Sequence, residues 1–135
     1  MAERQIVQEL GKANQGPLAA AKVEFGNLIA RDSNGYLVQA GDVLGQSNAC
    51  GVCNKTVDNS AGVAGDLTTE YITGAAFWFK NDAIDPVAQV HLGQNAYIKN
   101  SVTVCASSGA SNNLVAGIVM ELDSSRGVKI YIGSR

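Results

Sequence analysis

The chain has 135 residues, with 10 Lys and Arg against 12 Asp and Glu, so its formal net charge is −2. This length suits one domain with a core of its own, and the charge balance argues against a nucleic-acid partner. Charged residues make up only 16% of the chain, below the roughly 25% usual for soluble domains. We therefore expect part of the surface to be covered by another protein.

Membrane and secretory classes are not expected. The chain contains no run of about 18 apolar residues, and its first residues, "MAERQIVQEL", lack the basic-then-apolar order of a signal peptide. Its three cysteines are an odd number, which makes a disulfide framework improbable and reduced thiols the default. We expect a soluble protein, made in a cytoplasm, with no membrane partner.

The beginning of the chain is set apart from the rest. Residues 1–17 are expected to be an arm, extended and ordered against a partner. A short helix is the alternative, because Ile6, Val7 and Leu10 would share one face. The segment "GKANQGP" breaks regular patterns after it. Residues 18–135 are expected to form a single β domain.

Short apolar runs separated by Gly, Asn, Asp and Ser recur at intervals of about 8 to 12 residues, a spacing typical of all-β folds. We expect a small β-barrel or β-sandwich with at most one or two short helical turns. Alternation is clearest at the end, where Val128, Ile130 and Ile132 share one face. The predicted strands are 19–25, 27–31, 36–40, 68–73, 75–80, 96–99, 102–106, 116–122 and 128–132.

Turn signals connect some of these strands. "DSSRG" predicts a hairpin between the last two strands, and "DSNG" (32–35) predicts another, in which the Asn-Gly pair takes positive φ angles. The best helical candidate is "DPVAQVHLG". There Asp85 would cap, Pro86 would occupy the first helical position, and Gly93 would take the left-handed exit.

The "CGVC" motif has the spacing of half a zinc site or of a dithiol redox motif. A closed zinc site needs four ligands. Cys50, Cys53, Cys105 and His91 are all the Cys and His that the chain contains, and they come from three distant segments. A redox pair is expected at a helix N-terminus within a βαβ pattern, which is absent here. Small buried thiols are the favoured interpretation, with no metal and no cofactor.

Catalytic sets are equally weak. A Ser, His and acid triad has only His91 available, in an apolar segment with no Ser-centred elbow, so a structural histidine is favoured. Asp82 and Asp85 lie close together in "NDAIDP". That pair suggests acid-base work or calcium, but Asp before Pro is the ordinary sign of a turn or cap. An enzyme is not expected.

Three aromatic residues in a row mark the strand "AAFWFK". Phe77 and Phe79 would share one face of it and Trp78 would point to the other. Both faces would then be apolar. Either the strand is central between two packed layers, which we favour, or Trp78 contacts a neighbouring subunit, because Trp is enriched at interface hot spots.

The order of motifs resembles a known family. "VDNSAGVAGDLTTEYITGAAFWFKN", then "DPVAQVHLGQNAYIKNSVTVCAS", then "NNLVAGIVMELDSSRGVKIYIG" is similar to the capsid cement or head decoration proteins of tailed bacteriophages. In that family a "VDN-G-aG" turn leads into an aromatic-rich strand, and "aGivv-vd…GV-v-i" closes the domain. The resemblance covers roughly residues 26–133. "CGVC" stands where the pattern has an apolar strand, and residues 1–17 lie outside the pattern.

The resemblance implies a non-enzymatic virion protein on the outer capsid surface, made in the host bacterial cytoplasm. It would bind the major capsid protein, often as a homotrimer, and stabilise the expanded shell. We expect a long turn on the rim of the barrel over 57–68, in which Asp58 and Asn59 hydrogen-bond the turn backbone and Gly62 and Gly65 supply positive φ. Those four residues and Trp78 are the interface candidates. A head-fibre base or receptor-binding module, and a thiol redox protein using "CGVC", remain the alternatives.

Overall fold

The computed structural model describes residues 12–106 and 112–133, and the described chain is almost entirely β. Within these residues, the one helical element is a 3₁₀ turn, η1. The elements are β1 (Lys12–Pro17), β2 (Lys22–Val23), β3 (Leu28–Arg31), β4 (Leu37–Gln39), β5 (Gly51–Cys53), β6 (Val57–Asp58), β7 (Thr68–Thr73), β8 (Ala75–Asn81), η1 (Gln89–His91), β9 (Asn95–Asn100), β10 (Thr103–Cys105), β11 (Val115–Asp123) and β12 (Gly127–Ile132).

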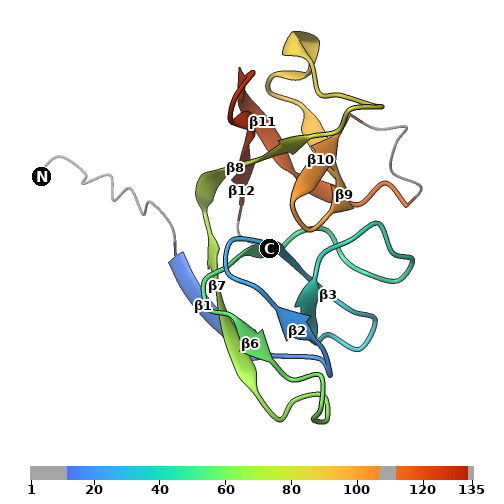
Figure 1. Cartoon of the computed structure of the whole chain (residues 1–135), viewed down its shortest axis with the longest axis vertical. Coiled ribbons are helices and arrows are strands. Elements are labelled where there is room, and N and C mark those ends of the chain that lie inside the picture. Colours follow the sequence, from blue (N-terminus) through green and yellow to red (C-terminus); the bar gives the residue numbers. More distant parts are fainter. Residues whose placement is uncertain (1–11, 107–111, 134–135) are drawn as a thin grey trace, which may run out of the picture.

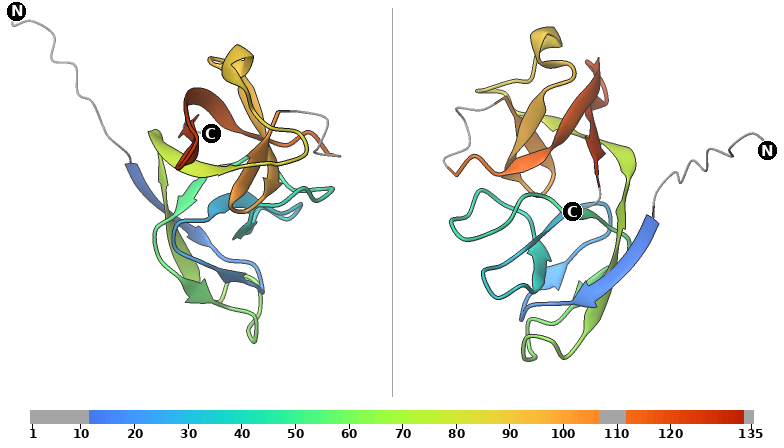
Figure 2. Two further views of the ribbon diagram at one scale, coloured as in Figure 1. Left: turned by 45° about the horizontal axis from the view of Figure 1, so that its top comes forward. Right: turned by 180° about the vertical axis from the view of Figure 1, so that it is seen from behind.

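Two β structures are stacked end to end, as Figures 1 and 2 show from three directions. One is a closed barrel with the strand order β10-β8-β12-β11-β9, and the other is a five-stranded sheet with the order β1-β7-β5-β3-β4. A parallel pairing of Thr103 with Lys80 closes the barrel. β2 and β6 form a separate two-stranded ribbon. The expected small all-β barrel or sandwich is confirmed.

The chain passes from the sheet into the barrel at Gly74. This residue has φ of +76° and is the single residue between the end of β7 and the start of β8. Its N–H donates to the carbonyl of Ile132 at 2.7 Å, so the last barrel strand also reaches this bend. One nearly continuous strand therefore belongs to both β structures.

Two apolar cores follow from the alternation of side chains along β3. Leu28 and Ala30 point into the larger core, which also fills the barrel with residues such as Ile98 and Ile130. Ile29 points to the opposite face, into a smaller core that contains Leu18, Val23, Leu37, Cys50, Cys53 and Tyr71. β3 is thus covered on both faces, which explains its continuous apolar sequence.

Most predicted strands lie where the apolar runs placed them, and both predicted hairpins exist. In the 32–35 hairpin only Gly35 has a positive φ, +87°, so the expectation that Asn34 shares it was wrong. The strand predicted at 19–25 shrinks to Lys22–Val23. A tight turn precedes it, with Ala21 N–H donating to Ala19 O at 2.7 Å, and a second turn follows, with Asn27 N–H donating to Glu24 O.

Three strands were not predicted. β1 (Lys12–Pro17) pairs antiparallel with all of β7, so this part of the expected arm is paired within the chain. Residues 1–11, with the alternative helix through Ile6, Val7 and Leu10, lie outside the described residues. β6 is two residues long. β5 is formed by the "CGVC" segment, so this motif is itself a strand before "VDN" and does not replace one.

Candidate functional site

The expectation that the 57–68 turn lies on the rim of the barrel was wrong, because the turn connects β6 of the two-stranded ribbon to β7 of the five-stranded sheet. It begins at β6, where Val57 and Asp58 pair with β2. Asp58 then closes a local turn, because its Oδ1 accepts hydrogen bonds from the backbone N–H of Ser60 at 3.0 Å and from the Ser60 hydroxyl. The Ser60 hydroxyl, followed by the Ser60 amide and the charge of Lys22, lowers the pKa of Asp58 below its usual value. Asp58 therefore performs the expected turn-forming role in ionised form at neutral pH.

Asn59 is the buried centre of the turn, with 3% of its surface exposed. Its Nδ2 donates to Ala19 O at 3.1 Å and to Val63 O at 3.0 Å. Its backbone N–H donates to Ala21 O at 3.0 Å. Because one buried side chain bridges the turn and the 18–21 segment, the turn is fixed to the sheet by paired polar groups.

The two glycines have different roles. Gly65 has φ of +92°, as expected, and its N–H donates to Leu18 O at 2.9 Å. Gly62 does not have a positive φ, so that part of the expectation was wrong. It is needed for space, because a Cβ at this position would collide with Oδ1 of Asn59. Gly62 therefore allows the buried amide to sit beneath the turn.

Apolar side chains face outward from this frame. Val63 is 69% exposed and Leu67 is 43% exposed. Their backbone groups are held in place: Val63 N–H donates to Oδ2 of Asp66 at 3.0 Å, and Leu67 O accepts from Leu18 N–H at 2.9 Å. The turn thus presents two preformed apolar contacts at low entropic cost to a partner. The sequence analysis did not single out these two residues, although each is an apolar residue among turn residues.

Trp78 lies elsewhere, on barrel strand β8 opposite Lys129. It is half-buried and belongs to neither core. The guanidinium of Arg126 stacks over its ring, with Cζ 4.3 Å from the ring centroid, and Arg126 pairs with Asp123 at 3.0 Å. The structure therefore brings Asp58, Asn59, Gly62 and Gly65 together and leaves Trp78 on the outside of the barrel.

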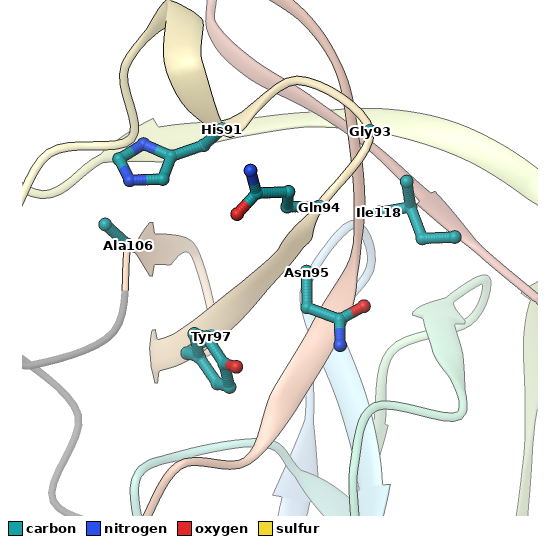
Figure 3. A pocket seen from close by; sticks show the side chains of 7 residues that line it. All are labelled: His91, Gly93, Gln94, Asn95, Tyr97, Ala106 and Ile118. Carbon is teal, nitrogen blue, oxygen red and sulfur yellow. The ribbon is translucent and has the colours of Figure 1, made fainter.

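A pocket of about 520 Å³ lies on the same barrel, beside η1. Figure 3 shows the seven residues that line it, among them His91, Gln94 and Tyr97 on one side and Ile118 on the other. Side chains that can donate or accept hydrogen bonds predominate around it. Sequence reasoning missed this pocket because its residues come from three separate parts of the chain: the segment from η1 into β9, the residue after β10, and β11.

The predicted helix at 85–93 is shorter than expected. Only Gln89–His91 is helical, after Ala88 and not after Asp85, while Gly93 takes the predicted positive φ of +81°. Asp82 is buried, and its Oδ2 accepts from the N–H of Asp85 at 3.2 Å, as a turn cap does. Nδ1 of His91 accepts from Ala88 N–H at 2.8 Å. These side chains hold the loop together.

The three cysteines are free and buried. Cys50 directly precedes β5, Cys53 is its last residue, and both belong to the smaller core. Cys105 is fully buried, and this burial, followed by the negative charges of Asp85 and Asp82, raises the pKa of its thiol to about 11. Within residues 12–106 and 112–133, no three His, Cys, Asp or Glu side chains come together as ligands for a metal ion.

Comparison with protein-family models, with curated proteins and with solved structures found no match. Among the described elements there is no helix long and apolar enough to cross a membrane.

Proposed function

We propose that the protein is a structural virion component that binds the outer surface of a tailed-bacteriophage capsid and stabilises the expanded shell. Its partner is the major capsid protein, it associates with copies of itself as a homotrimer, and it is made in the host bacterial cytoplasm. The 57–68 turn is the observation that carries the proposal. It is the first motif of the family resemblance, and it combines a hydrogen-bonded frame with exposed Val63 and Leu67.

The engagement of the polar side chains supports binding over catalysis. His91 Nδ1 holds the amide of Ala88, and Asp82 caps its own loop. The thiol of Cys105 is fully buried and has a raised pKa, which keeps it protonated at neutral pH. These three side chains, which carry groups that often take part in catalysis, therefore have structural roles here.

Linkage supplies the mechanism. A protein that binds the expanded shell but not its separated or unexpanded subunits stabilises that shell by its binding free energy at each site. A ligand at 100 times its Kd contributes about 2.7 kcal/mol per site. Because this free energy is contributed at every site of the shell, even a modest affinity would stabilise the shell against dissociation and against internal pressure.

The test is co-sedimentation of the purified protein with expanded heads that lack it, beside unexpanded proheads. We expect saturable binding to the expanded heads alone, at a copy number that approaches that of the major capsid protein. Binding to neither shell would overturn the proposal, and a few copies per particle would instead indicate a fibre base or receptor-binding module.

A matched pair of variants assigns the binding to the turn. Val63→Asp places a charge on the exposed apolar surface of the turn and should weaken shell binding at least tenfold. Val43→Asp is the control, because Val43 is 50% exposed on a different loop, between β4 and β5. Equal loss of binding in both variants would remove the turn from the proposal.

A further inference from the structure

The strand register defines one continuous outer face of the barrel. Directly opposed residues in antiparallel strands point to the same side. Val128, Ile130 and Ile132 of β12 are fully buried inside, so Lys129 and Tyr131 point outward. We call the outward residues of four neighbouring strands the barrel face: Ala76 and Trp78 on β8, Lys129 and Tyr131 on β12, Ile118 and Glu121 on β11, and Asn95 and Tyr97 on β9.

The middle of this face is apolar and exposed. Ile118 is 41% exposed and lies between Tyr131 on one side and Asn95 on the other. Tyr131 is 37% exposed, and Met120, at the irregularity in β11, is 55% exposed. A row of neighbouring apolar side chains on two adjacent strands, β11 and β12, is typical of a surface that another protein covers.

The two ends of the barrel face differ in shape and chemistry. At the β8 end, the guanidinium of Arg126 stacks over Trp78, and its side chain is 57% exposed. At the β9 end is the pocket, whose lining includes Asn95, Tyr97 and Ile118, as Figure 3 shows. One end offers an aromatic ring and a cation, and the other offers a hollow with amide and hydroxyl oxygens.

These ends are complementary to each other. Arg126 uses Nε and one Nη on Asp123, and a guanidinium has five N–H donors. The side-chain oxygens of Asn95 and Tyr97, which line the pocket, are acceptors that such donors can reach. The ion pairs Arg126–Asp123 and Lys129–Glu121 are partly exposed, so exchanging them for contacts with a neighbour costs little.

We propose that the barrel face is the surface through which copies of this chain associate, with the Trp78–Arg126 end of one copy against the pocket beside Ile118 of the next. A contact between two different patches is heterologous and forms closed rings when the rotation permits. The expected ring size, three, rests on the proposed function. The choice of face rests on the register, the exposed apolar row and the complementary ends.

Sedimentation equilibrium of the purified full chain tests this assignment. The wild-type protein should have the mass of a trimer at high concentration. Ile118→Asp and Arg126→Glu should each reduce that mass to one chain, a threefold loss, because one charges the apolar row and the other reverses the cation. Leu44→Asp is the control, because Leu44 is 87% exposed on the loop between β4 and β5, outside the barrel face, and this variant should leave the mass unchanged.

Circular dichroism of each variant verifies that the fold is intact, and Arg126→Glu, at an exposed side chain, provides a readout even if Ile118→Asp unfolds. A monomeric wild type, or folded Ile118→Asp and Arg126→Glu variants with wild-type mass, would overturn the assignment. Shell co-sedimentation separates the two proposals. If the protein is a trimer that binds no shell, the proposed capsid function is overturned and the proposed role of the barrel face stands. If it is a monomer that binds shells, the role of the barrel face is overturned and capsid binding stands.

Discussion

At the scale of single residues, Asn59 has the largest predicted effect in the 57–68 turn. Asn59→Ala would leave the carbonyls of Ala19 and Val63 without their buried donor, which costs about 1–3 kcal/mol. Urea unfolding should show this loss as a lower midpoint at unchanged slope. Asn54→Ala, at an exposed amide, should stay within about 0.5 kcal/mol of wild type. Equal effects of the two substitutions would contradict the central role of Asn59.

Also at the scale of single residues, Cys105 predicts that the free energy of unfolding depends on pH. Its pKa is raised to about 11 in the folded chain, whereas an unfolded thiol titrates near 8.5. Above the lower value the unfolded state loses its proton first, so the thiol contributes stability below about pH 8.5 that is lost progressively up to about pH 11.

The measurement for Cys105 is urea unfolding at a series of pH values between 8 and 11, on the wild type and on Cys105→Ala, and the difference between the two curves isolates the thiol. We expect the wild type to lose more stability than the variant over this range. Parallel curves would show that the folded thiol titrates like the unfolded one.

Some turn residues have roles set by their neighbours in the sequence, and others have roles set by residues far away in the sequence. Asp58 bonds Ser60, two positions away, and Gly65 adopts the left-handed conformation common to turn glycines, so turn chemistry predicts both. Asn59 bonds Ala19, 40 positions away, and the requirement at Gly62 is set by the side chain of Asn59. Neither is visible in local sequence, because each depends on which segments the fold brings together.

At the scale of elements, β5 is specified by its neighbours. A Cβ at Gly51 would collide with the carbonyl of Ile72 on β7, so the pairing of these strands requires glycine here. We expect Gly51→Ala to cost about 1–3 kcal/mol, the range for overpacked interiors. Gly41→Ala is the matched control, because its nearest atom, Cγ2 of Val43, is 3.4 Å away. Thermal unfolding that ranks the two variants equally would contradict this account.

The same dependence explains which strands the sequence predicts. β7, β8 and β12 contain runs of β-branched and aromatic residues, and in β12 the alternation matches the buried face. β1 has the sequence KANQGP, with no apolar alternation, and becomes a strand because β7 offers it six partners. "CGVC" carries the spacing of a metal or redox motif and is a strand for the same reason, with β3 and β7 on either side.

At the scale of the whole molecule, the larger core joins the two β structures. Leu28 belongs to sheet strand β3 and is fully buried in the cluster that contains the barrel residues Ile98 and Ile130. Gly74 adds a backbone link, because its N–H bonds the carbonyl of Ile132. A core shared in this way predicts that the sheet and the barrel unfold in one cooperative transition.

Leu28→Ala tests this coupling. The cavity should destabilise the chain by about 2–5 kcal/mol, and hydrogen exchange should report the same loss of protection in β12 of the barrel as in β5 of the sheet. The reason is that neither structure keeps a complete core when the other opens. Val63→Ala, on the exposed surface of the turn, should leave protection in both strands unchanged. If Leu28→Ala lowered protection in β5 alone, the barrel would be an independent folding unit. A loss of shell binding in this variant would then be due to the sheet with its 57–68 turn and not to the barrel face.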